Sequence, residues 1–255
     1  MSSVPTTGVC ILSIDVRVGD GRVETSDLFL ADLCRQLAAA QLPATWSFSG
    51  PPADALRLAI DEHRGCELAL LAEASWAAEG ASRSRFCQGL ADGLAAIGSV
   101  GLTPATLSLP NGRLASHDDV LVRHGVRAVR VAAGGSRQEP RVQRWWRRKE
   151  TTLRAISPIR WGLWEVPVNV DLSVAGLAGA TRMVDRTARH AGVVVVAADV
   201  TTLDREAKRL PRLVDHLKRR SEEKLLRIET IAASVARQQV PRQTPARSIL
   251  RPLAA

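Results

Sequence analysis

Three carboxylate side chains follow short apolar runs, where they could take part in chemistry. Asp15 directly follows VCILSI, Glu73 follows CELALLA, and Asp199 ends GVVVVAAD. Carboxylates that converge can act as general acid and general base, or can hold a hard cation with water completing its shell. The ends of parallel strands meet at one edge of a sheet, so one hypothesis is a hydrolase site built from these three residues.

The histidines and cysteines lack the spacing of a metal site. No two of the five histidines stand at ligand spacing, and the four cysteines lie far apart, each within an apolar segment: Cys10, Cys34, Cys66 and Cys87. This pattern predicts small buried thiols rather than zinc ligands or a disulfide framework. Phosphate-binding glycine loops and a nucleophile elbow are also missing. We therefore expect no metal and no cofactor.

The elements that must position these residues alternate along the chain. Apolar runs predict strands near 9–14, 42–50, 66–72, 105–112, 127–133, 162–170 and 192–200. Amphipathic stretches between them predict helices, and residues 204–237 are expected to form one or two more helices. A strand–helix repeat of this kind favours right-handed crossovers and a parallel sheet covered on both faces.

The domain organisation follows from the same pattern. We expect an N-terminal extension over 1–8, one α/β domain over 9–236, and a disordered basic tail over 237–255. A basic insertion over 134–160 carries the stretch RVQRWWRRK at 141–149. The net charge of +9 and this Arg/Trp stretch admit nucleic acid as a partner, although solvated arginines are the simpler interpretation. The N-terminus resembles no signal peptide and no run is long enough for a membrane span, so we expect a cytoplasmic protein without a membrane partner.

Four stretches, in order, resemble the polysaccharide deacetylase family with its NodB-homology domain. LSIDVR at 12–17 is similar to the family's T-F-D-D-G, and LPATWSFSG at 42–50 to its A-T-F-F-V strand. GCELALLAEAS at 65–75 is similar to G-H-E-I-G-N-H-T-x-x-H, and LSLPNG at 107–112 to R-x-P-Y-G. The resemblance implies a single-domain α/β fold, a deformed (β/α) barrel of about seven parallel strands, with its site at the C-terminal strand ends.

The resemblance also implies a metal-dependent deacetylase site, of which little is left in this chain. The family's catalytic base falls on Asp15, whereas its three metal ligands fall on Val16, Leu71 and Ser75. The arginine that braces the base falls on Ser108 and the acidic histidine on Ala198. Valine and leucine cannot coordinate a cation, and a site needs three or four converging donors. A plain helix-capping role for Asp15 is an equal alternative.

The sequence therefore predicts a pseudoenzyme that binds a saccharide or a protein partner, with an active hydrolase centred on Asp15 as the alternative. Six residues are expected to line its cleft or to fill simpler roles in core packing and turns: Trp46, Glu73, Asn111, Trp164, Glu165 and Asp199. For the tryptophans the simpler role is core packing, for Asn111 it is a turn, and a buried Glu165 would need an arginine partner.

Overall fold

Strands and helices alternate along the chain, as the sequence predicts. The computed structural model describes residues 7–18, 23–63, 65–78, 80–110, 117–132 and 155–239. The strands are β1 (Gly8–Val16), β2 (Thr45–Phe48), β3 (Glu67–Leu71), β4 (Thr106–Leu109), β5 (Ala128–Val131), β6 (Ser157–Pro158), β7 (Trp164–Pro167), β8 (Val170–Asp171), β9 (Val193–Asp199) and β10 (Leu226–Glu229). The helices are α1 (Val23–Ala39), α2 (Asp54–Glu62), α3 (Ala74–Ala77), α4 (Arg83–Gly98), α5 (Asp118–Arg123), α7 (Leu172–His190), α8 (Val200–Arg205), α9 (Leu210–Glu222) and α10 (Ile231–Gln239).

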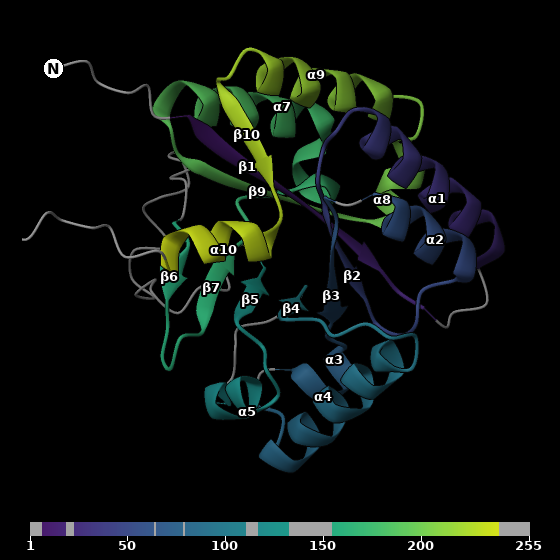
Figure 1. Ribbon diagram of the computed structural model, residues 1–255, viewed down its shortest axis with the longest axis vertical. Helices are drawn as coiled ribbons and strands as arrows, with labels where there is room; N and C mark the ends of the chain where they lie inside the picture. The colour runs from purple at the N-terminus through teal and green to yellow at the C-terminus, as the bar shows by residue number, and fades with distance from the viewer. Residues whose placement is uncertain are drawn as a thin grey trace, which may run out of the picture.

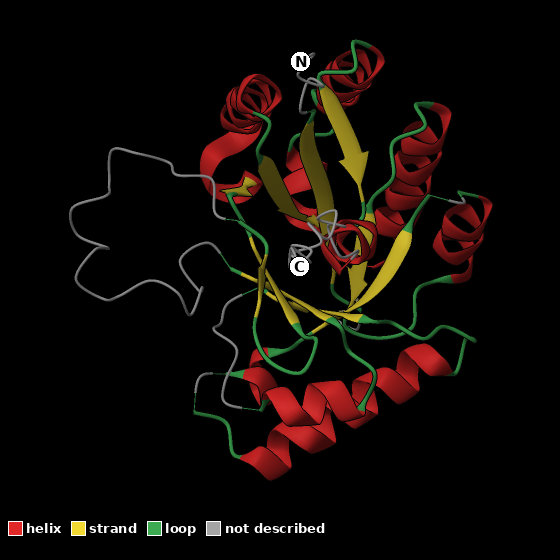
Figure 2. Cartoon of the chain, turned by 60° about the vertical axis from the view of Figure 1, so that its left-hand side comes forward, coloured by secondary structure: helices red, strands yellow, loops and turns green. Residues whose placement is uncertain are grey.

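The strands form one curled sheet that closes into a half-barrel (Figures 1 and 2). Their order is β6-β7-β5-β4-β3-β2-β1-β9-β8, and every described pair is parallel except β6 with β7. The long strand β1 pairs with β10 through its first half and with β2 through its second half. The predicted deformed (β/α) barrel is confirmed.

Helices cover the convex side of this sheet, where the larger apolar core lies. Successive side chains of a strand point to opposite faces, and on β1 the residues Leu12, Ile14 and Val16 face the helices. They join Leu30 of α1 and Leu90 of α4 in one buried cluster. The near-continuous apolar character of the strands, on which the prediction rested, follows from burial on both faces.

The concave side holds a second, smaller core that α10 closes. Ile231 and Val235 of α10 pack against inward residues such as Val9 and Val195. The carboxylate of Glu67, at the N-terminal end of β3, accepts hydrogen bonds from the backbone N–H of Ala232 and from two threonine hydroxyls. A carboxylate suits the N-terminus of a helix, so Glu67 fastens α10 across the N-terminal end of the half-barrel.

Strand β10 differs from the sequence prediction, which assigned residues 204–237 to helices. Leu226–Glu229 instead forms strand β10, parallel to the start of β1. Leu225, Ile228 and Ile231 recur at a helical spacing, but Leu226 and Ile228 also alternate with polar residues as in a strand. The open edge beside the first half of β1 decides between the two readings, because it offers hydrogen-bond partners to an extended segment.

Two further predictions fall largely outside the described residues. Of the insertion over 134–160, the structure describes only residues 155–160, which include strand β6. Of the expected tail over 237–255, it describes only residues 237–239, which form the end of α10. Within the described residues, no helix combines the length and the apolar character needed to cross a bilayer.

Candidate functional site

A buried ion pair lies at the C-terminal ends of the strands, inside the half-barrel. One terminal nitrogen of Arg130, on β5, donates to both carboxylate oxygens of Asp15, on β1, at 2.7 Å each. The Arg130 side chain is 1% exposed and that of Asp15 is 11% exposed. In the described part of the chain, the Asp15 carboxylate is therefore held by a cation from across the sheet rather than by a helix N-terminus.

Two serines complete the support of this arginine. Ser108 on β4 accepts a hydrogen bond from Nε of Arg130 at 3.1 Å, and its hydroxyl lies 2.7 Å from that of Ser47 on β2. Both serines are fully buried. The hydrogen-bond network Ser47–Ser108–Arg130–Asp15 joins side chains from four strands and fixes the carboxylate in one orientation. Such connections satisfy the hydrogen-bonding needs of buried polar groups.

The electrostatic environment of Asp15 contains opposing influences. Burial raises the pKa of the Asp15 carboxyl, and the nearby Asp199 carboxylate raises it further. The guanidinium groups of Arg130 and Arg17 oppose that rise. The pKa remains above the ordinary aspartate value because desolvation is the largest influence.

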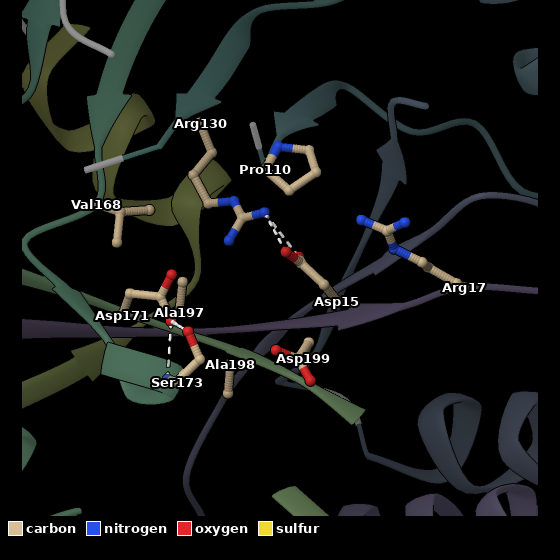
Figure 3. Close-up of a pocket in the computed structure, with 10 residues that line it drawn as sticks. All are labelled: Asp15, Arg17, Pro110, Arg130, Val168, Asp171, Ser173, Ala197, Ala198 and Asp199. Carbon is tan, nitrogen blue, oxygen red and sulfur yellow. Dashed lines mark hydrogen bonds and ion pairs between the residues drawn. The ribbon is translucent and has the colours of Figure 1, made fainter. Parts of the chain in front are cut away.

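A small polar pocket opens beside the pair (Figure 3). It encloses about 160 Å³ and is lined by Asp15, Arg17, Pro110, Arg130, Val168, Asp171, Ser173, Ala197, Ala198 and Asp199. Three aspartates and two arginines give the lining a formal charge of −1. Asp171 caps α7 through Ser173 N–H, and Asp199 caps α8 through Thr202 N–H, so both carboxylates are held in place.

Asp15 and Asp199 are the two predicted cleft residues that the fold brings together. They are partners in the β1–β9 register, and both line the pocket. Glu73 lies elsewhere, exposed at the start of α3, where it accepts a hydrogen bond from Ser75. The three-carboxylate constellation is thus assembled only in part.

The remaining predicted cleft residues lie away from the pocket or outside the described chain. Trp46 is buried in the helix-facing core, which matches the core-packing interpretation. Trp164 begins β7 and packs against the inner core at the opposite end of the half-barrel. Glu165 is buried on the alternate face of β7 and does not line the pocket. Asn111 lies outside the described residues.

The positions that correspond to the family's metal ligands do not form a donor set. Val16 faces the helix-side core, Leu71 is buried, and Ser75 is exposed on α3. Within the described part of the chain, no three His, Cys, Asp or Glu ligand atoms converge at the pocket. A divalent cation needs several converging N, O or S donors, so the described residues do not fit the family's metal centre.

Solved structures share this architecture across nearly the whole chain. A Mycobacterium smegmatis protein assigned to the polysaccharide deacetylases is 14% identical with a TM-score of 0.67, and the match covers 92% of each chain. The chain has the polysaccharide deacetylase fold. A carbohydrate esterase family 4 (CE4) pseudoenzyme from Bacillus anthracis is 12% identical with a TM-score of 0.52, covering 91% of this chain and 66% of that one.

The polysaccharide deacetylase fold also occurs in a protein of different chemistry. A 4-alpha-glucanotransferase from Thermococcus litoralis has a TM-score of 0.64 at 13% identity, covering 92% of this chain and 41% of its own. No protein-family model and no curated protein matches the sequence. At these identities the likeness establishes the fold, and the activity has to be argued from the site.

Arg130 holds the central carboxylate of the site, yet it was not among the predicted site residues. By the resemblance, the family's bracing arginine is replaced by Ser108, but the structure supplies an arginine from the next strand, with Ser108 in contact with it. A signal was present, because Arg130 interrupts the buried run AVRV of β5. A charged residue within a buried strand requires a partner of opposite charge.

Proposed function

We propose that this protein is a pseudoenzyme that binds a saccharide in the polar pocket beside Asp15. The observation that carries the proposal is that the site keeps the carboxylate of the base but has apolar residues at the metal-ligand positions. The carboxylate at the position of the catalytic base is kept and braced by Arg130, while Val16 and Leu71 stand where the family's metal ligands would be. A neighbour in fold, from Bacillus anthracis, is itself a CE4 pseudoenzyme.

The chemical reason lies in how amide deacetylation obtains its nucleophile. A metal ion lowers the pKa of bound water and polarises the carbonyl group, and a carboxylate base alone supplies neither effect. Here both oxygens of Asp15 already accept hydrogen bonds from Arg130. The site is therefore better suited to orienting a polar ligand than to activating water.

The pocket favours a neutral, hydroxyl-rich ligand. Its carboxylates can accept hydrogen bonds from sugar hydroxyls, while Arg17 can donate. The formal charge of −1 disfavours an anion. A volume of about 160 Å³ lies below the roughly 300–1,000 Å³ typical of drug-sized ligands, which favours one sugar ring rather than a long chain in the pocket itself.

A binding experiment with a pocket-filling variant tests this proposal. Calorimetric titration with chito-oligosaccharides, acetylated and free, is expected to show binding to the wild-type protein that Ala197→Leu abolishes. Ala197 lines the pocket, whereas Ala178→Leu makes the same change on the exposed surface of α7 and should bind normally. Absence of binding to both sugar series, or equal binding by the two variants, would refute the proposal.

The second candidate, an active hydrolase, is favoured by the Asp15–Arg130 pair and by the adjacent Asp199. Acetate release from the acetylated oligomers, with and without added zinc, measures it directly. We expect no release. Release that disappears in Asp15→Asn, in protein whose circular dichroism is unchanged, would replace the pseudoenzyme proposal with this one.

Other expectations about partners and compartment stay proposals. Nucleic-acid binding through the Arg/Trp stretch at 141–149 would fall steeply with added salt, because it would release counterions. We expect no such binding, and we expect a cytoplasmic protein, consistent with four free cysteines.

A further inference from the structure

A cluster of three soft ligand groups lies at the other end of the half-barrel from the pocket. The Sγ atoms of Cys34 and Cys66 and a ring nitrogen of His63 all lie within 4.8 Å of one another. Cys66 Sγ is 3.0 Å from Nδ1 of His63. Cys34 and His63 are buried, and Cys66 is half-buried.

Three separate elements bring these groups together. Cys34 lies on α1, which packs beside α2 (Figure 1). His63 directly follows α2 as its C-cap residue, and Cys66 N–H donates to His63 C=O at 3.0 Å before β3 begins. Gly65 lies close to the histidine, since a Cβ there would be 3.5 Å from Nε2 of His63.

The donor set matches a borderline or soft metal ion. Two thiolates and one imidazole are ligands that zinc and other borderline transition metals prefer. Around a tetrahedral zinc, such donor atoms would be about 3.6–3.8 Å apart, since Zn–S bonds are about 2.3 Å and Zn–N bonds about 2.0–2.1 Å. In the structure Cys66 Sγ and His63 Nδ1 are 3.0 Å apart and all three donor atoms lie within 4.8 Å of one another, so shifts of about an ångström would bring them to the zinc spacing. Two thiolates would also neutralise the divalent charge, which favours a largely buried ion.

We propose that Cys34, His63 and Cys66 bind one transition-metal ion, with zinc as the favoured ion. The site is independent of the proposed saccharide pocket, because Cys66 precedes β3 while the pocket lies beyond the C-terminal ends of the strands. The ion would join α1, the end of α2 and the start of β3, so its role is to stabilise the fold. The cluster is not evident from cysteine spacing or histidine spacing taken separately, because it combines a cysteine from α1 with a histidine and a cysteine that lie three residues apart.

Cobalt(II) titration of the reduced, full-length protein tests the site. We expect one equivalent of cobalt to give an intense near-ultraviolet sulfur-to-cobalt charge-transfer band, which one equivalent of zinc removes. Cys66→Ser should weaken cobalt affinity by more than about 100-fold, because losing a group that only hydrogen-bonds a metal ligand already costs about 10–100-fold. His63→Gln provides a second ligand variant if the first does not fold.

Cys87→Ser is the matched control. Cys87 is also half-buried, but it lies on α4 outside the cluster, so this variant should bind cobalt as the wild-type protein does. Zinc should raise the Tm of the wild-type and Cys87→Ser proteins and leave that of Cys66→Ser unchanged. Three results would overturn the proposal: no charge-transfer band, equal weakening by Cys66→Ser and Cys87→Ser, or a Cys34–Cys66 disulfide in the protein as purified.

Discussion

Replacing Arg130 by methionine removes the cation that compensates the buried Asp15 carboxylate, while keeping a side chain of similar length. The two bonds between Arg130 and Asp15 are both 2.7 Å, and the arginine is 1% exposed. Breaking a buried ion pair from one side costs about 3–5 kcal/mol, because the remaining charge is left uncompensated. Asp15 borders the pocket, so water can reach it and we expect the lower end, about 3 kcal/mol. For a chain of this size that corresponds to a fall in Tm of about 6–12 °C.

Urea unfolding of matched variants measures this loss. Arg83→Met breaks the exposed Arg83–Asp119 pair and should leave the free energy of unfolding nearly unchanged. The double variant Arg130→Met/Asp15→Leu should recover most of the stability, because an apolar pair can replace a buried ion pair at little cost.

The dependence on pH gives a second test of the same reasoning. In Arg130→Met the pKa of Asp15 should rise further, since burial raises it already and its main opposing charge is gone. The folded state then binds the proton more tightly than the unfolded state. The loss of stability should therefore shrink as the pH falls through that raised pKa towards about 3.9, the unfolded value. A loss no larger than that of Arg83→Met, or one that does not shrink on acidification, would refute this account.

Three further predictions concern packing and burial elsewhere in the half-barrel. Ser108→Ala should lower the free energy of unfolding by about 1–3 kcal/mol in urea, because it leaves a buried guanidinium N–H without its acceptor. Burial raises the pKa of the Glu67 carboxyl, so the contribution of Glu67 to stability should become more favourable as the pH falls through that raised pKa. Glu67→Gln should therefore flatten this part of the curve of unfolding free energy against pH, measured with urea. Gly89→Ala should lower the Tm, since its Cβ would come within 2.2 Å of Trp76, at an overpacking cost of about 1–3 kcal/mol. Gly98→Ala, whose Cβ would meet no atom within 4 Å, should leave the Tm unchanged or slightly higher, and equal effects of the two substitutions would contradict the packing argument.

The main architecture could be predicted because it depends on local periodicity. The long β-branched run of β9 and the run before Asp15 favour buried strands, and their alternation with helices favours a parallel sheet. Strand β10 could not be predicted in this way. Its alternation of apolar and polar residues competes with a helical spacing, and the free edge of β1 decides the outcome.

The candidate site, like the fold, could be predicted from the sequence only in part. The sequence by itself placed a carboxylate, Asp15, near the end of the first strand, and the resemblance to the polysaccharide deacetylases placed valine and leucine at the family's metal-ligand positions. Only the tertiary structure decided that Arg130, 115 residues away, compensates this carboxylate, and that Cys34, His63 and Cys66 share one corner of the molecule. The physical reason is that charge compensation and metal ligation depend on distances of a few ångströms between groups. Those distances are set by the order of strands in the sheet and by helix packing, which spacing along the chain does not encode.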